Sequence, residues 1–513
     1  PARARGRLAR GPAPADGPAV LLGLFRGELL RDTSMRPVLC VGPTDSGKTS
    51  GIAYPTLALG WGHSALVWDY KGTMWREVAP LRDRLGPVLV LDLTRPGGPR
   101  YNPLMAVRPG DHLVPDAQHV AAILCEAERP TFWDRAAQSY MVGAIVHVLT
   151  AGPDSERCLA GVRRLITSGD AGARRMMAPG SHPTARRAAQ ELWSAQAPAG
   201  EGGDGAPAAR DGSRGGGGEE GKGLNMRQGV YTTASVLLAD FESGVLAGQT
   251  AASDFRVSDL VCGDRPVTLC LVSRPAEARR YRRVYKLVVT QAVDLLTAAR
   301  DEADDGRPKR WRLLLALDEF LQFGMPEVSE WVRYVREYGI RPLLLAQSLG
   351  DVEAMYGEGL VNNCRLVALR PGAPPDAERL SRMVGVAQEE VPTLSVSRRR
   401  WWEPATRTTG TRVDRREVLP PHAVMAMGGN EALVFGYGKP IRAERIPYYE
   451  VEPWKTMHAG ALARAGTLPA WKPNPEANPW IGQAWREPRR GDPNGVGEAA
   501  PPRPKRRVRQ LGT

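Results

Sequence analysis

With 513 residues, the chain is long enough for about two or three domains and can bury a large core without disulfide or metal staples. Its formal net charge of +13 favours a polyanionic partner, either nucleic acid or an anionic membrane surface, although arginine-rich codon usage would give the same excess. The six scattered cysteines include no Cys-x-x-Cys pair and have no histidine at ligand spacing, which argues against both a disulfide framework and a zinc site.

The amino-terminal residues 1–19 are rich in Arg, Pro and Ala and lack apolar periodicity, which predicts a flexible basic arm. The most apolar early runs, Ala19–Leu24 and Met141–Leu149, are too short to span a bilayer. The chain begins at Pro1 without an initiator methionine. We therefore expect a soluble cytoplasmic protein if the chain is complete, and a membrane anchor ahead of Pro1 if it has been trimmed.

A glycine-rich turn follows the apolar run Val38–Val41 and reads Gly42-Pro43-Thr44-Asp45-Ser46-Gly47-Lys48-Thr49. A strand, then a glycine-rich turn, then Lys-Thr opening a helix is the order of a phosphate-binding loop. Glycines let successive N–H groups curl around the β-phosphate, and the helix presents its positive end to that anion. We expect Lys48 to reach the β- and γ-phosphates of ATP and Thr49 to hold Mg²⁺. The alternative is a chance match in a glycine-rich chain, and the flanking strand argues against it.

Strand-like runs at 65–68 and 88–91 each end at an aspartate and alternate with the helical stretch Met74–Leu85. This alternation predicts a parallel α/β sheet, and we assign residues 20–119 to the first part of a nucleotide-binding domain. Residues 120–257 instead carry apolar side chains at helical spacing, which predicts an all-α insertion. Within it, residues 197–223 are mostly Gly, Ala and charged residues, and we expect a disordered loop there.

Buried-strand patterns return after the insertion, so we assign residues 258–453 to the second part of the nucleotide-binding domain. The runs that predict its strands are 266–272, 313–317, 342–346 and 365–369. Residues 454–513 are rich in Pro, Gly, Trp and Arg, and we expect a disordered basic tail.

The run at 313–317 delivers Asp318 and Glu319 to the carboxyl end of its strand, where ligands sit in open α/β sheets. We expect Asp318 to belong to the Mg²⁺ shell and Glu319 to polarise the attacking water, as in an ATP hydrolase. The next strand ends at Gln347, which would contact the γ-phosphate or else is an ordinary polar strand end. Lys48 and Asp318 are much farther apart in the sequence than one crossover requires, which favours a motor or coupling device over a small-molecule kinase.

From about Val20 to Tyr449 the chain resembles the conjugative coupling ATPases of type IV secretion systems. The departures are the missing transmembrane helices ahead of the phosphate loop, the glycine-rich run and the long tail. Besides the phosphate loop, the motifs that carry the resemblance are Asp69-Tyr70-Lys71-Gly72, Tyr101-Asn102-Pro103-Leu104, Phe132-Trp133-Asp134-Arg135-Ala136-Ala137, Ser253-Asp254-Phe255, Leu317-Asp318-Glu319-Phe320, Tyr338-Gly339-Ile340-Arg341, Gln347-Ser348 and Asn363-Cys364-Arg365.

The resemblance implies a RecA-like P-loop NTPase domain with an inserted all-α domain, assembled as a homo-hexamer at the cytoplasmic face of the inner membrane. It also implies ATP hydrolysis coupled to DNA transfer, with sequence-independent DNA binding, and relaxase or other secreted substrates and channel proteins as partners. Two alternatives stay open. One is a chromosome-partitioning or packaging translocase on a similar core, and the other is a nucleotide-gated adaptor with little turnover.

The resemblance also assigns a role to Arg336, which lies between the Asp318-Glu319 strand and the Gln347 strand. In the family, an arginine at this position is proposed to reach the γ-phosphate of the neighbouring subunit. Arg333 and Arg341 are the other cations nearby. A solvated or salt-bridged helix face over 325–338 is the alternative, since three glutamates lie in the same stretch.

Overall fold

The computed structural model describes residues 8–9, 17–127, 129–194, 219–242, 244–397, 406–446, 448–450, 452, 454–464 and 472–483. The chain divides into two compact units. The sheet unit comprises Pro1–Val88, Leu260–Cys270 and Ala299–Pro469, and the helical unit comprises Leu89–Asp259, Leu271–Ala298 and Ala470–Thr513. From the sequence patterns we expected the helical part to span residues 120–257. The helical unit is larger than this expectation, because it also contains residues 89–119 and 271–298.

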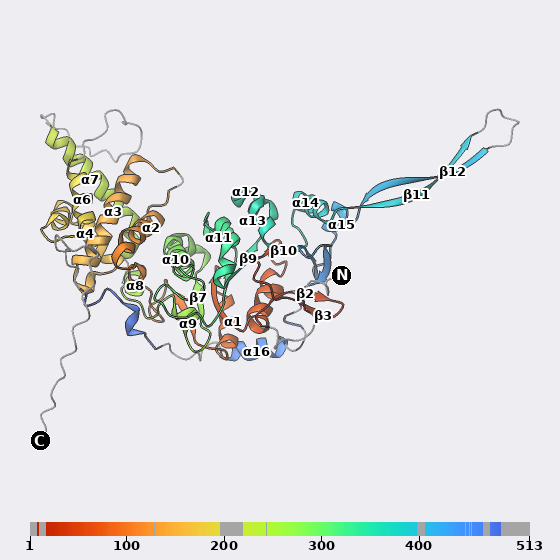
Figure 1. Cartoon of the computed structure of the whole chain (residues 1–513), viewed down its shortest axis with the longest axis horizontal. Coiled ribbons are helices and arrows are strands. Elements are labelled where there is room, and N and C mark those ends of the chain that lie inside the picture. The colour runs from red at the N-terminus through yellow and green to blue at the C-terminus, as the bar shows by residue number, and fades with distance from the viewer. Residues whose placement is uncertain are drawn as a thin grey trace, which may run out of the picture. The chain divides into compact units, whose positions relative to one another are not determined.

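Five of the described strands of the sheet unit run parallel in the order β10-β4-β9-β8-β5. Every residue of these strands is buried, as expected of a parallel sheet covered on both faces. In Figure 1, helices α11, α12 and α13 lie above β9, and α1 and α16 lie below. The strands are β4 (Val38–Val41), β5 (Ser64–Asp69), β8 (Leu313–Leu317), β9 (Ile340–Ala346) and β10 (Arg365–Leu369).

Antiparallel strands extend this sheet beyond β10, in the order β13, β14, β2, β3 and β1. Arg26 and Gly27 connect β2 to β3 with positive φ angles of 55° and 76°, the backbone of a tight hairpin turn. The unit boundaries fall within the other two strands of the sheet, β7 and β6. These strands are β1 (Leu8–Ala9), β2 (Val20–Phe25), β3 (Glu28–Asp32), β6 (Val88–Asp92), β7 (Thr268–Val272), β13 (Glu431–Val434) and β14 (Ile441–Glu444).

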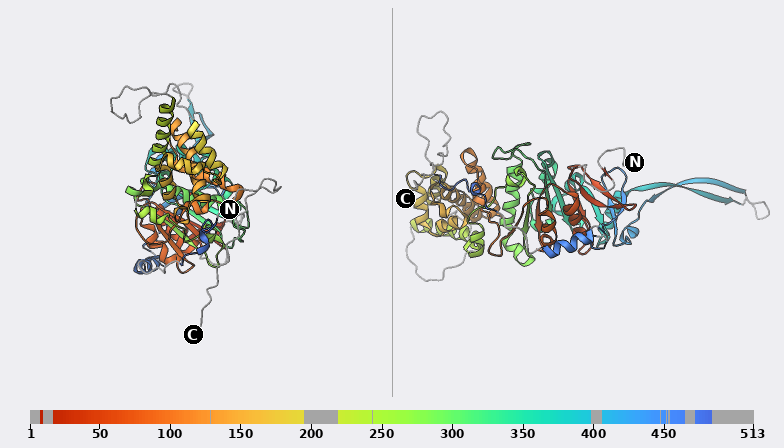
Figure 2. Two further views of the ribbon diagram at one scale, coloured as in Figure 1. Left: turned by 90° about the vertical axis from the view of Figure 1, so that its left-hand side faces the viewer. Right: turned by 90° about the horizontal axis from the view of Figure 1, so that it is seen from below.

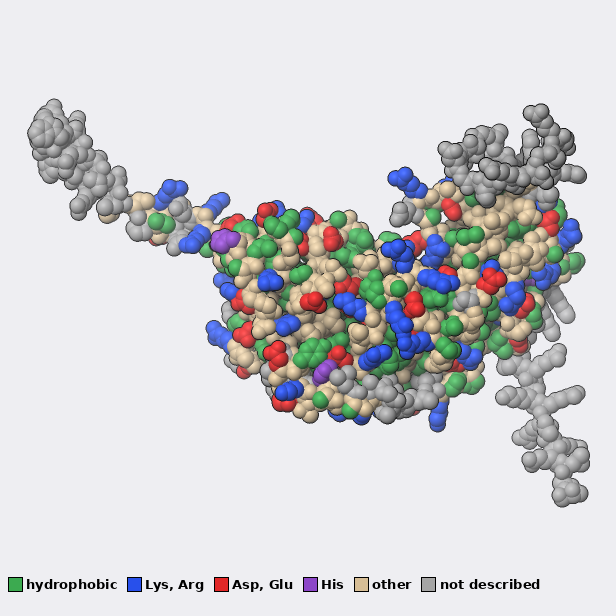
Figure 3. Space-filling view, turned by 180° about the vertical axis from the view of Figure 1, so that it is seen from behind, with side chains coloured by type: hydrophobic (Ala, Val, Ile, Leu, Met, Phe, Trp, Pro, Cys, Tyr) green, Lys and Arg blue, Asp and Glu red, His purple; other side chains and the backbone are tan. Residues whose placement is uncertain are grey.

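A long antiparallel hairpin, β11 (Val386–Ser397) and β12 (Thr406–Glu417), forms a separate two-stranded sheet and projects from its unit (Figure 1). The side chains described in it are exposed, including Val386 and Val413, and Figure 3 shows Lys and Arg side chains among them. The sequence analysis did not predict these strands, because their described side chains are exposed rather than packed on a core, and no regular apolar alternation marks them.

The remaining helices of the sheet unit are short and connect or cover its strands. They are α1 (Met74–Arg82), α11 (Val328–Tyr334), α12 (Leu349–Tyr356), α13 (Glu358–Asn363), α14 (Pro374–Val384), α15 (Pro421–Met425) and α16 (Trp454–Arg464), while α9 (Asp259–Cys262) spans a unit boundary.

The helical unit is built around α3 (Phe132–Ala151), which packs against α2, α4, α6 and α7. A capping box starts α3, because the Thr131 hydroxyl accepts from the Asp134 amide and the Asp134 carboxylate accepts from the Thr131 amide. Figure 2 shows these helices from two further sides. The others are α2 (Leu113–Leu124), α4 (Leu159–Thr167), α5 (Asp170–Met177), α6 (Pro183–Ser194), α7 (Glu219–Leu237), α8 (Gly244–Gln249) and α10 (Pro275–Leu296).

Three expectations of disorder need correction. The predicted flexible arm 1–19 is wrong at Leu8–Ala9, which form β1 and pair with β3, while residues 1–7 and 10–16 lie outside the described part of the chain. The predicted disordered loop 197–223 is wrong at its end, because α7 begins at Glu219, while residues 197–218 lie outside the described part of the chain. The predicted disordered tail is wrong for α16, whose His458 pairs with Glu77 of α1 at 3.2 Å. It is also wrong for residues 472–483, where the buried Trp480 side chain donates its indole N–H to the Val107 carbonyl oxygen at 2.7 Å. Burial of individual anchoring side chains orders these short segments despite their Pro-rich and Gly-rich composition.

Within the described residues, the helices are all too short or too polar to serve as a membrane span.

Candidate nucleotide site

The phosphate loop begins where β4 ends, and it remains tied to the neighbouring strand. The Gly42 amide donates to the Ala346 carbonyl oxygen at 3.2 Å, which continues the β4–β9 ladder into the loop. Asp45 and Gly47 adopt left-handed φ angles of 61° and 88°. The buried Lys48 ammonium donates to the carbonyl oxygens of Gly42 at 2.6 Å and Pro43 at 3.0 Å. The loop therefore curls around the Lys48 ammonium, which occupies its own carbonyl oxygens here.

A helix opens at Lys48 and Thr49, as expected, but its hydrogen bonds have π-type spacing. In η2 (Thr49–Ala53) the Tyr54 amide reaches back to the Thr49 carbonyl oxygen, and in η3 (Thr56–Gly60) the Trp61 amide donates to Thr56. Pro55 lies between the two turns and supplies no amide donor, which accounts for the interruption. The half-buried Thr49 stands in the first turn, next to the loop.

Arg445, directly after β14, lies against this loop. A β-carbon built at Gly47 would be 1.8 Å from the Arg445 Nη1 atom, and one at Gly51 would be 2.2 Å from its Cγ atom. The guanidinium Nη2 donates to the Asn430 side-chain oxygen at 3.2 Å, and the Arg445 amide donates to the Asn430 carbonyl oxygen at 2.6 Å. Arg445 Nε is buried and makes no hydrogen bond to any residue that the structure describes. The sequence analysis missed Arg445, and no motif around it could have pointed to this position.

Asp318 and Glu319 follow β8 and are both buried. The Asp318 amide donates to the Trp68 carbonyl oxygen at 3.3 Å, so the ladder with β5 also extends into the site. Burial raises the pKa of the Asp318 carboxyl to about 6, and the nearby Glu319 and Asp69 carboxylates raise it further against the opposing effect of Lys71 and Lys48. Among the described residues, the buried Oδ1 atom of Asp318 has no hydrogen-bond partner.

Glu319 has a left-handed backbone, with φ 50° and ψ 46°. This conformation is unfavourable for a residue other than glycine, and such strain concentrates at functional positions. Asp69, at the end of β5, has another role: its carboxylate accepts from the amides of Gly72 at 2.8 Å and Trp75 at 2.9 Å. Burial raises the Asp69 pKa to about 6 despite these hydrogen bonds, and the side chain shapes the turn that leads into α1.

Gln347 is exposed directly after β9, and Ser348 next to it caps α12 by accepting from the Asp351 amide. Because β4, β8 and β9 are adjacent parallel strands, their carboxyl ends share one edge of the sheet. The structure therefore brings together the predicted site residues that follow these strands. They are Gly42, Pro43, Thr44, Asp45, Ser46, Gly47, Lys48, Thr49, Asp318, Glu319 and Gln347.

The structure does not bring Arg336 to this edge. Arg336 is exposed in η9 (Val335–Tyr338), ahead of β9, and its charge acts on Arg36, which precedes β4. Both arginines therefore lie at the amino ends of the strands, about 20 Å from the phosphate loop for a strand of seven residues. Arg341 is fully buried and pairs with Asp32 at 2.9 Å, which makes it a structural residue. The expected helix over 325–338 is divided into α11 and η9.

Two further motifs of the sequence analysis meet within the helical unit. The Asn102 amide donates to the Ser253 hydroxyl at 3.0 Å, and the Arg100 guanidinium pairs with Asp254 at 2.8 Å. The rings of Tyr101 and Phe255 stack with their centroids 5.4 Å apart. These motifs hold segments far apart in the sequence together, so their role is in folding rather than in chemistry.

Residues 12–467 match the model of the family described as type IV secretory system conjugative DNA transfer. The chain belongs to this family. The conjugal transfer protein TraG of Escherichia coli is a relative with 32% identity over 390 residues, which covers 71% of this chain and 58% of TraG. A TraG of Agrobacterium fabrum is 26% identical over 43% of this chain and 33% of its own length. The match thus spans little more than half of the Escherichia coli TraG and about a third of the Agrobacterium fabrum TraG.

Solved structures of the bacterial conjugative coupling protein TrwB share the fold. The unbound form has a TM-score of 0.55 at 16% identity, covering 83% of this chain and 88% of TrwB. TrwB in complex with ADP and Mg²⁺ has a TM-score of 0.54 at 16% identity, covering 86% of this chain and 93% of TrwB. The predicted family, and the RecA-like P-loop fold with a helical domain, are confirmed.

Proposed function

We propose that this chain binds and hydrolyses ATP with Mg²⁺ and couples hydrolysis to the transfer of DNA into a type IV secretion channel. The observation that carries this proposal is the meeting of Lys48, Thr49, Asp318 and Glu319 at one edge of the sheet, in a chain of the conjugative transfer family. TrwB, which shares the fold, has been solved with ADP and Mg²⁺.

The residues around Asp318 fit a magnesium ion. Its Oδ1 atom is buried without a described partner, and the half-buried Thr49 follows the lysine of the loop. Among the described side chains, no group of three or more His, Cys, Asp or Glu residues could hold a metal ion alone. Magnesium typically takes one or two protein ligands and completes its shell with phosphate oxygens and water. Thr49 and Asp318 would hold the ion, which neutralises phosphate charge when bound.

Three protein groups act on the reacting phosphate in this proposal. Lys48 neutralises the β- and γ-phosphates, Glu319 orients the attacking water, and Gln347 contacts the γ-phosphate from the end of β9. Arg445 adds a cation from the same subunit, because its stem lies along the first helical turn and its guanidinium reaches Gly47. A guanidinium in this position suits the α- and β-phosphates, which such forks bind in a bidentate manner.

Arg336 stays a proposal for the neighbouring subunit of a homo-hexamer. Its position at the amino ends of the strands prevents it from serving the site of its own subunit, so any role in hydrolysis requires a second copy. The remaining partners follow from the family alone: DNA bound without sequence preference, a relaxase or another secreted substrate, and channel proteins at the inner membrane. The family match argues against the partitioning translocase.

The test is steady-state ATP hydrolysis of the purified chain with Mg²⁺, compared with Lys48→Ala and Glu319→Gln. We expect turnover to fall at least 100-fold in both variants. Lys48→Ala removes the charge that neutralises the phosphates, and Glu319→Gln removes the carboxylate that orients the attacking water. Glu319→Gln should retain ATP binding. If the unmodified chain binds ATP tightly without turning it over, even with DNA present, the adaptor alternative is correct instead.

A further inference from the structure

An arginine-rich face of α10 lines a cavity in the helical unit, and none of the residues that line it belongs to the nucleotide site. The cavity has a volume of about 310 Å³ and lies among the end of α2, the end of α7, η7 (Ala239–Glu242) and the second and third turns of α10. We call it the arginine pocket. Its lining residues are Leu124, Leu237, Asp240, Phe241, Arg279, Arg280, Arg282, Arg283 and Val284.

The charges of the arginine pocket are not balanced. One of its four arginines, Arg280, pairs with Asp240, the only carboxylate in its lining. Arg283 donates to the main-chain oxygen of Glu126 at 3.0 Å. The Glu126 carboxylate is already paired with the buried Lys286 at 2.9 Å. Among the residues that the structure describes, three of the four arginines that line the cavity therefore have no carboxylate partner.

The spacing of these arginines shows that helix stability does not explain their presence. Arg279 is three residues from Arg282 and four from Arg283, so like charges are neighbours on one helix face. Each such pair destabilises an isolated helix. Arg279 and Arg282 form no salt bridge within the described parts of the chain. A bound anion would turn this repulsion into attraction.

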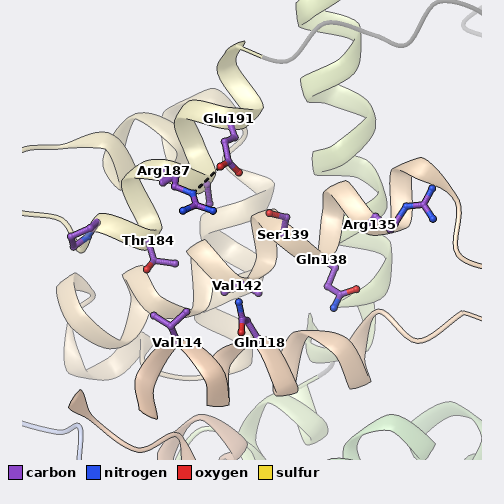
Figure 4. A pocket seen from close by; sticks show the side chains of 11 residues that line it. Val114, Gln118, Arg135, Gln138, Ser139, Val142, Thr184, Arg187 and Glu191 are labelled. Atoms are coloured by element: carbon purple, nitrogen blue, oxygen red, sulfur yellow. Dashed lines mark hydrogen bonds and ion pairs between the residues drawn. The ribbon is translucent and has the colours of Figure 1, made fainter. Parts of the chain in front are cut away.

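A second cavity of the same unit provides the contrast. It has a volume of about 580 Å³ and is lined by α2, α3 and α6 (Figure 4). One of its arginines, Arg187, is paired with Glu191 at 2.8 Å, and most of its other polar groups are amides and hydroxyls. This cavity has no comparable charge excess, and Arg187 therefore serves as a matched control.

We propose that the arginine pocket binds backbone phosphates of single-stranded DNA. This inference rests on the proposed function, because it assigns a binding place to the DNA substrate. Guanidinium forks match phosphate oxygens, and the apolar side chains of Leu124, Phe241 and Val284 at the cavity can contact a sugar or base. A recessed cavity of this size receives a phosphate from a flexible strand, whereas a stiff duplex holds its phosphates on a convex surface.

The experiment measures binding of a fluorescent oligonucleotide to the full chain by anisotropy, over a series of salt concentrations. The variant Arg279→Ala/Arg282→Ala should bind single-stranded DNA at least tenfold more weakly at low salt. The slope of log affinity against log salt should fall by about 1.4, since each lost phosphate contact contributes about 0.7 for a single strand. Arg187→Ala should bind like the unmodified chain. Arg279→Lys/Arg282→Lys should keep most of the salt slope, because the charges remain.

Each other outcome has a defined meaning. If the unmodified chain binds DNA and the double alanine variant binds it equally, with an unchanged slope, the arginine pocket is not the site, while the proposed function stands. If the unmodified chain binds no DNA at all, the proposed function fails together with this inference. The assignment to single-stranded DNA is wrong if the double alanine variant loses affinity for duplex DNA only. It is also wrong if the binding that this variant loses can be displaced by polyglutamate alone. Binding of an ATP analogue should be equal in all variants, which verifies folding.

Discussion

The Arg445 guanidinium lies against Gly47 of the phosphate loop, where a β-carbon built on the glycine would be 1.8 Å from the Arg445 Nη1 atom. We expect Arg445→Ala to weaken binding of ADP and ATP by about tenfold to 100-fold, the range for one charge-assisted hydrogen bond. Titration with a fluorescent nucleotide measures this change in affinity. The exposed Arg442 on β14 provides the matched control, and Arg442→Ala should bind ADP and ATP as the unmodified chain does. Unchanged ADP and ATP affinities in Arg445→Ala would show that the guanidinium only covers the loop.

Gly51 provides an independent test of the same contact. In an ordinary helix, replacing glycine by alanine stabilises by about 1 kcal/mol, but a β-carbon here would be 2.2 Å from the Arg445 Cγ atom. Gly51→Ala should therefore displace Arg445 and weaken nucleotide binding as much as Arg445→Ala. In the Arg445→Ala background the same change should cost nothing further and should raise the melting temperature. Additive losses of affinity in the double variant would contradict the shared mechanism.

Arg336 is predicted to act only between subunits. Arg336→Ala and Lys48→Ala should each be inactive in ATP hydrolysis, and an equimolar mixture should recover activity, because an intact loop meets an intact arginine at some interfaces. Arg333→Ala, an exposed neighbour on α11, should hydrolyse ATP normally. The prediction is wrong if Arg336→Ala alone is active, or if mixed rings assemble and stay inactive.

The raised pKa of Asp318 predicts a pH-dependent stability. With a folded-state pKa of about 6, above the ordinary value of 3.8, the buried carboxylate destabilises the fold when it is ionised. The protonated Asp318 carboxyl lets the fold keep its full stability below about pH 4, and this stability is lost as the pH rises through 6. Without nucleotide and Mg²⁺, Asp318→Asn should therefore be more stable than the unmodified chain at pH 7.5, by about 3 kcal/mol. The difference should shrink toward pH 4.5.

Thermal unfolding of both proteins across this pH range measures the effect of Asp318→Asn. Glu378→Gln removes an exposed carboxylate of α14 and should leave the pH dependence unchanged. A constant difference between Asp318→Asn and the unmodified chain at all pH values would show that Asp318 does not titrate in this range.

The strands that carry the nucleotide site were predictable because they are fully buried. The runs Val38–Val41 and Arg365–Leu369 have the predicted bounds, and a polar group or glycine ends the apolar run in each case. The β2–β3 hairpin was missed because its turn is only Arg26-Gly27. The β11–β12 hairpin was missed because its described side chains face solvent. Arg445 reaches the loop through the pairing of β14 with β13 and its contacts with Asn430, which depend on tertiary structure alone.

The position of β4 between β9 and β10 has a consequence for how the molecule is made. Asp32 and Arg341, which pair in the core, are 309 residues apart in the chain. During synthesis the phosphate loop emerges long before either strand that flanks β4 exists, so its apolar residues stay uncovered until most of the chain has left the ribosome. Contacts between residues so far apart in the sequence make folding slow, and neither half of the chain can complete the sheet alone. Two fragments divided at the glycine-rich run should therefore remain unfolded separately and recover nucleotide binding only when produced together.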